Sequence, residues 1–336
     1  MTAAQQDNDP GTGEVSASDV AAAAGRLAGH AVRTPLLSIA DLDALTGARV
    51  FLKAETLQRT GSFKFRGAFN RIAQIDAAHT PGGVVAFSSG NHGQAVASSA
   101  RQFGLRATVI MPSDAPAIKI ELTRGHGAEV ILYDRLNEDR AAIAGRIVRE
   151  RGAILVPPYE DRDIIAGQGT IGLEIVEDLR ARGLTPDIVL SCCGGGGLVA
   201  GIATAVSAAA PAAKIYSVEP EQFDDTARSL AAGTRQSNAP GAKTICDAIV
   251  TPTPGEMTFA INRRLLAGGL SASDAEVKRA IVYASRQLKL VVEPGGAVAL
   301  AAVLAGKLDI AGKTVVVVLS GGNIDTALLS EILAAA

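Results

Sequence analysis

The stretch TGSFKFRGAFN at residues 60–70 places one lysine, Lys64, among small and apolar neighbours. Loss of hydration in such a setting lowers the pKa of a lysine amine, because burial penalises the charged form. A neutral amine can attack an aldehyde and later move protons. The same residues also suit a solvated lysine at the start of a helix. This turn alone therefore does not show whether Lys64 is a reactive amine or an ordinary surface cation.

Glycine-bearing turns follow several predicted strands and supply a second candidate chemistry. They are SSGNHG (88–93), CGGGGL (193–198) and SGGN (320–323). In open α/β sheets, ligands bind at the carboxyl ends of the strands. CGGGGL also opens a predicted helix, where bare backbone N–H groups make a cradle for a phosphate. We therefore predict a phosphate-bearing ligand at this loop, with a flexible turn of packing glycines as the alternative.

A dinucleotide is one ligand that fits the loop. Gly195, Gly197 and Ala200 match the pattern GxGxxA, and Glu219 ends the next predicted strand, where a ribose ligand would sit. This spacing favours an NAD-dependent dehydrogenase. It leaves Lys64 and the other two glycine turns unexplained, and the sequence has no GxxxxGK[ST] motif to indicate an ATP or GTP site.

The composition is that of a globular α/β protein. The chain has 336 residues, a formal net charge of −2, 48% hydrophobic residues and 36 glycines. That length allows one large domain or two ordinary ones, with a sizeable core. Lys and Arg are scattered and Trp is absent, so nucleic acid is not an expected partner.

The cysteines and the apolar runs bear on the compartment. Cys192, Cys193 and Cys246 are too few and too irregular for a disulfide framework, which favours a reducing compartment. The first 19 residues are polar and lack the apolar segment of a signal peptide. The longest apolar stretch, 188–210, is interrupted by glycines and serines, which predicts strand, loop and helix instead of a membrane span. We expect a cytoplasmic protein with no membrane partner.

Strands alternate with helices along the chain, which predicts doubly wound, mainly parallel sheets. Strands are predicted at 48–55, 82–89, 106–112, 128–134, 187–193, 214–220 and 313–322. Helices are predicted at 18–30, 67–75, 91–104, 116–127, 137–152, 168–183, 198–210, 274–288 and 295–306. The run of valines in the last strand suits a strand that is buried on both faces.

Together the motifs resemble a known family. The segments are KAETLQRTGSFKFRGA (53–68), SSGNHGQ (88–94), GGGGL (194–198), VEPGGA (292–297) and SGGN (320–323). In this order they resemble the fold-type II pyridoxal-phosphate enzymes, and most closely the serine/threonine dehydratase and serine racemase group. The resemblance runs from about residue 30 to the end of the chain.

This resemblance implies a fold. It is an α/β, tryptophan synthase beta-like architecture, with two doubly wound open sheets and the cofactor between two domains. Residues 15–75 and 158–336 would form the large domain that binds pyridoxal phosphate (PLP), and 76–157 the small domain. Residues 1–14 would be a disordered tail.

The resemblance also implies roles for cofactor-binding residues. Lys64 matches the lysine that forms the Schiff base with PLP, with Phe63 packing near the ring. Asn91 matches the residue that bonds the ring hydroxyl, and Ser320 the partner of the pyridine nitrogen. A serine at that nitrogen is a neutral partner, which suits β-elimination. The phosphate loop corresponds to Gly194, Gly195, Gly196, Gly197 and Leu198.

On the substrate side, the implied carboxylate loop consists of Ser88, Ser89, Gly90, Asn91 and His92. Ser89 matters further, because the racemases carry serine there, and its hydroxyl could protonate the face opposite Lys64. It could instead only help to hold the carboxylate. Arg140 falls where the racemases carry an arginine near the substrate, although it also suits a solvated helix. Ala248 and Tyr159 depart from the family pattern on this side.

A divalent cation site is also implied. It would consist of Glu219, Asp225 and the carbonyl of Phe223, with waters completing a shell for Mg²⁺. An ordinary acidic loop after a strand is the alternative.

The expected function is a PLP-dependent threonine/serine dehydratase, an ammonia-lyase that turns a 3-hydroxy amino acid into a 2-oxo acid and ammonia. Serine racemase, or a dehydratase of another 3-hydroxy amino acid such as hydroxyaspartate, is the alternative within the family. A dehydrogenase that binds NAD, or a cofactor-binding protein without turnover, is the alternative outside it. We expect a small amino acid as the partner molecule, and a homodimer or homotetramer.

Overall fold

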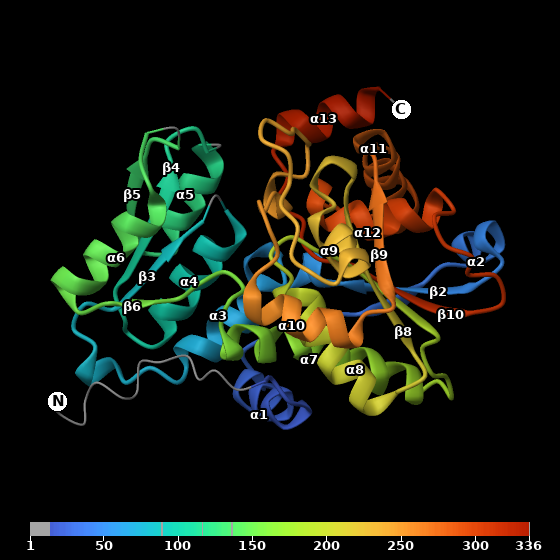
Figure 1. Cartoon of the computed structure of the whole chain (residues 1–336), viewed down its shortest axis with the longest axis horizontal. Helices are drawn as coiled ribbons and strands as arrows, with labels where there is room; N and C mark the ends of the chain where they lie inside the picture. The colour runs from blue at the N-terminus through green and yellow to red at the C-terminus, as the bar shows by residue number, and fades with distance from the viewer. Residues whose placement is uncertain (1–13, 89, 116, 136, 336) are drawn as a thin grey trace.

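The computed structural model describes residues 14–88, 90–115, 117–135 and 137–335. Their strands form two sheets, which lie in separate lobes of the molecule (Figure 1). The predicted α/β class with two sheets is confirmed.

The larger sheet has six strands in the order β1-β2-β10-β7-β8-β9. All neighbours pair in parallel except β1 and β2, which are antiparallel. The strands are β1 (Leu36–Ser38), β2 (Arg49–Ala54), β10 (Thr314–Leu319), β7 (Ile188–Cys192), β8 (Lys214–Pro220) and β9 (Gly268–Ala272). The valine-rich β10 lies between β2 and β7, and all its residues are buried, as the sequence predicts for a strand covered on both faces.

The smaller sheet has four parallel strands in the order β5-β4-β3-β6. The strands are β5 (Glu129–Tyr133), β4 (Ala107–Pro112), β3 (Val84–Phe87) and β6 (Ile154–Leu155). All of them lie within the segment expected to form the small domain, and the six strands of the larger sheet lie before and after it. The domain boundaries themselves stay a prediction.

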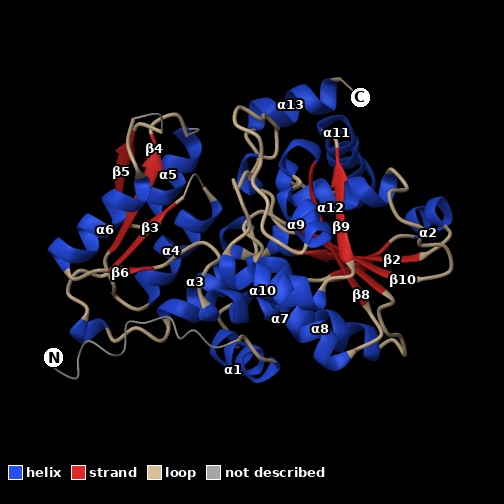
Figure 2. Ribbon diagram, in the orientation of Figure 1, coloured by secondary structure: helices blue, strands red, loops and turns tan. Residues whose placement is uncertain are grey.

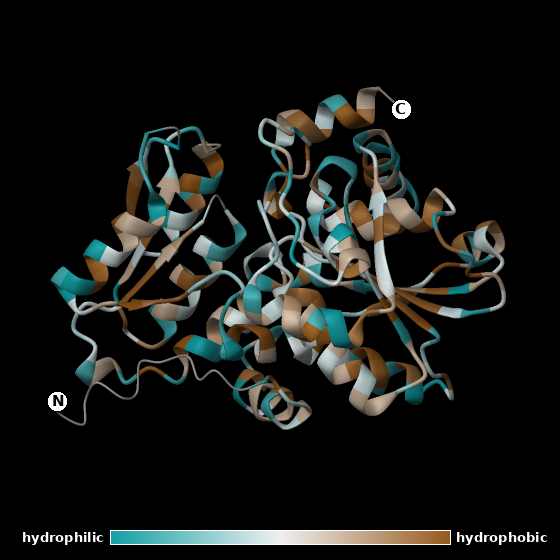
Figure 3. Ribbon diagram, in the orientation of Figure 1, coloured by the Kyte–Doolittle hydropathy of each residue, from teal (hydrophilic) through white to brown (hydrophobic). Residues whose placement is uncertain are grey.

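Helices cover both sheets, as Figure 2 shows. They are α1 (Ala17–Leu27), α2 (Ala40–Thr46), α3 (Lys64–Ile72), α4 (Asn91–Gln102), α5 (Ala117–Gly125), α6 (Arg140–Arg151), α7 (Arg162–Arg180), α8 (Gly197–Ala209), α9 (Asp225–Ala232), α10 (Glu256–Leu265), α11 (Asp274–Tyr283), α12 (Pro294–Leu304) and α13 (Thr326–Ala334). In Figure 3 the strands of both sheets carry mostly the brown of hydrophobic residues, while teal lies on outer helices such as α6. None of the helices described here is both long and apolar enough to cross a membrane.

Several helices begin where a side chain caps them and not where the apolar pattern begins. Helix α7 begins at Arg162, ahead of the predicted start at 168, because Asp161 accepts the N–H groups of Asp163 and Ile164. Ser16 caps α1 in a capping box with Asp19. The expected tail 1–14 lies outside the described residues except for its last residue.

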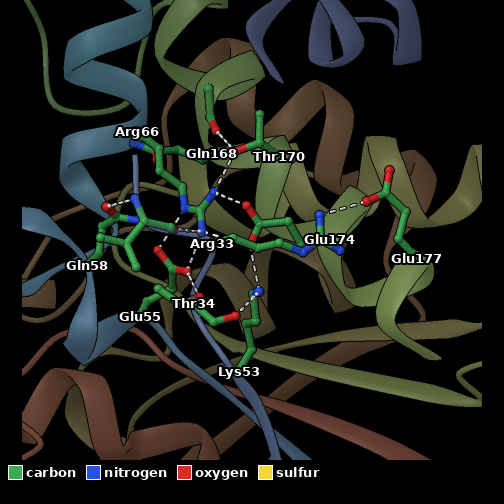
Figure 4. Close-up of polar contacts among 12 residues, drawn as sticks. Arg33, Thr34, Lys53, Glu55, Gln58, Arg66, Gln168, Thr170, Glu174 and Glu177 are labelled. Atoms are coloured by element: carbon green, nitrogen blue, oxygen red, sulfur yellow. Dashed lines mark hydrogen bonds and ion pairs between the residues drawn. The ribbon is translucent and has the colours of Figure 1, made fainter. Parts of the chain in front are cut away.

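A buried cluster of charges joins α3, α7 and strand β2 of the larger sheet (Figure 4). The Arg66 guanidinium bonds both oxygens of Glu55 at 2.8 Å, and it bonds the Glu174 oxygens at 2.7 and 2.9 Å. Lys53, from β2, adds a 2.6 Å bond to Glu174. Burial alone would raise the pKa of Glu174, but the bonds and charges of Arg66 and Lys53 hold that pKa below its usual value. Because Arg66 lies in the same first turn of α3 as Lys64, the cluster fixes that turn.

Replacing Arg66 tests how much this cluster contributes. Arg66→Ala is expected to lower the free energy of unfolding by about 3–5 kcal/mol, because the Glu55 carboxylate stays buried without its partner. Arg33→Ala is the matched control: Arg33 pairs with Glu177 and Asp178, but its side chain is 53% exposed. An exposed pair contributes about 0–1 kcal/mol. Urea unfolding followed by circular dichroism measures both variants, and an equal loss in the two would contradict this account of the cluster.

Candidate active site

One cavity receives residues from both lobes. Its volume is about 1140 Å³, counting the open mouth. From the larger lobe it is lined by the predicted cofactor residues Phe63, Lys64, Gly194, Gly195, Gly196, Gly197, Leu198 and Ser320, and from the smaller lobe by Ser88, Gly90, Asn91, His92 and Arg140. Segments far apart in the sequence therefore meet at the carboxyl ends of the strands, where ligands bind in such sheets.

Lys64 is held in place by backbone contacts with the loop after β10. It is the first residue of α3, and the turn before it forms a bridge between Ser62 and Gly321. The Phe63 N–H donates to the Ser320 carbonyl at 3.0 Å, and the Gly322 N–H donates to the Gly61 carbonyl at 2.9 Å. Two of the sequence motifs, TGSFK and SGGN, thus form one structural unit.

The Lys64 amine is partly buried in the cavity. Its Nζ donates to the carbonyl of Pro158 at 2.7 Å and lies 5.1 Å from the centre of the Phe63 ring. Burial lowers the pKa of Lys64 to about 8, although the nearby Cys192 and Glu293 raise it. At a given pH, the neutral and therefore nucleophilic fraction of this amine is larger than that of an ordinary lysine.

The loop 194–197 has no room for side chains. A Cβ at Gly195 would lie 2.3 Å from the Tyr159 ring, and one at Gly196 would lie 2.8 Å from Asn262 Nδ2. Gly196 takes a φ of 92° and caps α8 without a side-chain bond. The N–H groups of the first turn of α8 have no partner within the helix, so they suit a phosphate. This cradle fits the phosphate of PLP.

Ser320 and Asn91 offer neutral hydrogen-bonding groups to the same cavity. Ser320 is 3% exposed, and its Oγ accepts a bond from the Cys192 thiol at 3.1 Å. Burial raises the pKa of Cys192 to about 11, so the thiol is protonated at neutral pH. A buried amine, an anion cradle and a neutral partner for a ring nitrogen together fit PLP.

Ser88, Gly90, Asn91 and His92 line the same cavity as Lys64. The Gly90 N–H donates to Ser88 Oγ at 3.0 Å, and His92 Nε2 donates to the Val156 carbonyl at 2.8 Å. Burial and the charge of Lys64 lower the pKa of His92 to about 3, so the ring is neutral and supports the shape of the loop. Ser89, the predicted proton donor of a racemase, lies outside the described residues.

Cationic side chains besides Lys64 line the cavity. Lys119 pairs with Asp247 at 2.7 Å, and Arg135 pairs with Asp114 at 3.0 Å. The Arg140 guanidinium lies 5.1 Å from the centre of the Phe87 ring. Among the ion pairs of the described residues, none includes Arg140. Its charge is therefore available to an anionic ligand.

Two of the predicted cation ligands, Glu219 and Asp225, lie near each other. Glu219 accepts the N–H groups of Thr226 and Ala227 at 3.0 and 2.8 Å, and Asp225 accepts from Asn238 at 2.6 Å. Burial raises the pKa of Glu219 to about 8, with a further contribution from the Asp225 charge. No group of three or more His, Cys, Asp or Glu side chains in the described part of the chain could hold a metal. Ligation by this pair and the Phe223 carbonyl stays a prediction.

Two residues of the cavity were missed by the sequence reasoning. Glu293 lies inside the quoted motif VEPGGA, directly before the first proline of α12, and it is buried beside Asn91. The signal that the sequence offered was the position of this glutamate between an apolar run and a pair of glycines. Lys119 resembles an ordinary cation on an amphipathic helix, and nothing in its own segment indicates that it reaches the cavity.

The dehydrogenase alternative does not agree with the site. Both oxygens of Glu219 are occupied by the first turn of α9, so the carboxylate does not face the glycine loop as a ribose ligand would. The dinucleotide pattern also leaves the enclosed Lys64 amine without a function.

Comparisons with known proteins point the same way. The family model described as pyridoxal-phosphate dependent enzyme matches residues 27–321. An L-threo-3-hydroxyaspartate ammonia-lyase of Pseudomonas sp is 44% identical over 91% of this chain and 95% of its own length. The crystal structure of a threonine deaminase from T.th. is 43% identical, with a TM-score of 0.87, over 92% of this chain and 99% of that one. A maize serine racemase structure is 33% identical, with a TM-score of 0.89, over 96% and 98%.

These matches span nearly all of the chain and include the loops that line the cavity. The lysine turn, the glycine cradle and the serine after β10 lie together as the resemblance implies. The chain belongs to the fold-type II family of pyridoxal-phosphate-dependent enzymes.

Proposed function

We propose that this enzyme removes water from a 3-hydroxy amino acid and yields a 2-oxo acid and ammonia. The observation that carries the proposal is the enclosure of the Lys64 amine beside the glycine cradle and Ser320 in one cavity. The relatives named for ammonia-lyase and deaminase activity support the same reaction type.

The side chains of the cavity have different roles in the proposed reaction. PLP, when bound, supplies an electron sink for the electrons released at the substrate Cα. The Lys64 amine takes the Cα proton, because it lines the cavity and its lowered pKa, about 8, leaves a larger neutral fraction than an ordinary lysine has. Ser320 offers a neutral hydroxyl to the ring nitrogen. Asn91 opens α4, whose N-terminus attracts the substrate carboxylate.

The cationic side chains that line the cavity favour a substrate with a second carboxylate. L-Threonine and L-serine, the substrates expected first, have neutral side chains, whereas Lys119, Arg135 and Arg140 all line the cavity. Arg140 is the cation among these without a carboxylate partner in the described structure. We therefore propose 3-hydroxyaspartate as the preferred substrate, with its side-chain carboxylate on Arg140. The 44% identical hydroxyaspartate ammonia-lyase supports this choice. Racemisation by Ser89 stays a prediction.

The reaction is tested by incubating the PLP-loaded enzyme with L-threonine, L-serine and L-threo-3-hydroxyaspartate, and by measuring ammonia and 2-oxo acid. Lys64→Ala is expected to lose about 10³-fold in rate or more, and to lose the visible absorbance of bound PLP. The matched control Lys214→Ala changes an exposed lysine and should leave both unchanged. Chiral chromatography of the serine incubation measures racemisation. A wild-type enzyme that releases no ammonia, or that binds NADH in place of PLP, would overturn the proposal.

The role of Arg140 is tested by Arg140→Gln. Loss of a charged hydrogen bond to the second carboxylate is expected to lower kcat/KM for 3-hydroxyaspartate by about 10- to 100-fold, with little change for L-serine. Arg146→Gln removes an exposed arginine from the same helix outside the cavity and serves as the control. Equal losses for the acidic and the neutral substrate would show that Arg140 does not read the second carboxylate.

The lowered pKa of Lys64 gives a pH prediction for the enzyme without PLP. The folded-state pKa lies at about 8, below the ordinary 10.5, so the neutral, reactive amine is the minority form below pH 8 and the majority form above it. Acetylation of Lys64 by acetic anhydride, followed by mass spectrometry, should therefore rise with pH and level off above about pH 8. An unperturbed lysine peptide should continue to gain reactivity up to about pH 10.4. A Lys64 profile that follows the peptide would contradict the burial argument.

A further inference from the structure

We propose that Glu293 is a positioning residue for the cofactor site: together with Asn323, it fixes which end of the Asn91 side-chain amide faces the cavity. The inference rests on the proposed function, because it takes Asn91 as a partner of bound PLP. It adds two residues to the site and gives the VEPGGA motif a chemical role.

A chain of hydrogen bonds determines the orientation of the Asn91 amide, because only one assignment of its nitrogen and oxygen suits the partners on both sides. A backbone carbonyl can only accept, and the Thr60 carbonyl accepts from Asn323 Nδ2 at 2.8 Å. The same Nδ2 donates to Asn91 Oδ1 at 2.8 Å, so Asn91 presents its oxygen to Asn323. The Asn91 Nδ2 then donates to Glu293 Oε1 at 2.6 Å.

This arrangement leaves Asn91 as a donor toward the cavity. The Nδ2 amide carries two hydrogens, and Glu293 takes one of them. The other remains for a ligand, because Asn91 lines the cavity. An N–H donor is the group that suits an oxygen carrying negative charge, such as a deprotonated ring hydroxyl. With the amide reversed, Asn91 would present its oxygen to that same oxygen and repel it.

Glycines of two motifs leave the space that these side chains occupy. A Cβ at Gly321 would lie 2.2 Å from Glu293 Oε1, and a Cβ at Gly61 would lie 2.4 Å from Asn323 Oδ1. The carboxyl group of Glu293 and the amide of Asn323 are therefore enclosed by the backbone of the SGGN and TGSFK turns. This packing holds both side chains against Asn91 independently of any ligand.

Glu293 also carries a charge that can change near neutral pH. The residue is 2% exposed, and its Oε2 has no hydrogen-bond partner among the described groups. Burial raises its pKa to about 7. The charged groups that face it are Lys119 from α5, which lowers that pKa, Asp247 from the short helix Asp247–Ile249, which raises it, and Lys64 from α3, which lowers it. The Cys192 thiol of β7 also lies within its field.

Protonation of Glu293 removes this charge but not its contact with Asn91, because a protonated carboxyl still has an oxygen that accepts the Nδ2 hydrogen. The orientation of Asn91 should thus persist on both sides of the titration, while the electrostatic field at the cofactor changes. Two substitutions separate these effects. Glu293→Gln keeps an accepting oxygen and removes the titration, whereas Glu293→Ala removes both.

The experiment uses the full chain with PLP as the probe. Equilibrium dialysis measures the affinity for PLP. The absorbance of bound PLP, followed as a function of pH, reports the electrostatic field at the cofactor. Glu293→Ala is expected to bind PLP about tenfold more weakly, comparable with Asn91→Ala. Glu293→Gln is expected to bind within about threefold of the wild type, and to lack the absorbance change centred near pH 7 that we expect of the wild type. Glu129→Gln, which changes an exposed carboxylate of the small sheet, is the control.

The inference is overturned if Glu293→Ala binds PLP like the wild type, or if Glu293→Gln, which keeps the accepting oxygen, binds PLP as weakly as Glu293→Ala. If Glu293→Ala does not fold, as judged by circular dichroism without PLP, Asn323→Ala decides, because it removes the other hydrogen bond that orients Asn91: PLP binding like that of the wild type would overturn the inference. The proposed function fails differently: the wild-type enzyme would then release no ammonia from any 3-hydroxy amino acid. Ammonia release by the wild type together with unchanged PLP binding in the Glu293 variants would refute the positioning role alone.

Discussion

The attachment of the lysine turn to the loop after β10 is the constraint on which the site depends. The Phe63 N–H and the Gly61 carbonyl bond to residues 320 and 322, and these bonds fix the backbone of the lysine turn relative to the loop that carries Ser320. From the opposite side, the Arg66 cluster fixes the same turn against α7 and β2. A reactive amine must stay within reach of its substrate and its cofactor at once, and a turn that is fixed on both sides meets that demand without strain at the lysine itself.

Further contacts connect the smaller lobe to the larger lobe, which carries the lysine turn. Asn91, at the start of α4, bonds Glu293 and Asn323 of the larger lobe, and Lys119 of α5 pairs with Asp247. Both contacts lie at the cavity, so the smaller lobe is positioned through the residues that line the site. The buried charges in this region have partners of opposite sign close by, which limits the cost of keeping them out of water.

The sequence was sufficient for the parts of the site that depend on local chemistry. Lys64, Ser320 and the loop 194–197 stand in turns whose glycines and strand ends are recognisable without a structure. Glu293 could be read as part of a motif but not as a partner of Asn91, because that contact joins residues far apart in the chain. Lys119 carries no local signal at all, since its function arises only when α5 packs beside the larger lobe.

The same distinction applies to the fold. The strands with continuous apolar runs, such as β10, were predicted, and so were most of the long helices. The strand β9 has the sequence GGLSA and is only partly buried along most of its length, so it has no apolar pattern to detect. Helix α7 was predicted too late because its start is set by the Asp161 side chain and not by hydrophobic periodicity. Long-range pairing and capping, which single-segment patterns do not contain, account for these differences.

The close approach of Gly321 to Glu293 has a consequence for how this site can change over evolutionary time. Because a Cβ at 321 would lie 2.2 Å from Glu293 Oε1, a substitution at 321 must displace this carboxyl group unless the side chain at 293 has first become shorter. If position 321 is substituted first, the intermediate variant carries a side chain at 321 that overlaps with the Glu293 carboxyl group. The two positions are therefore epistatic, and accessible mutational paths through them have a direction. A library that varies residues 293 and 321 together would reach active sites that stepwise substitution beginning at 321 does not.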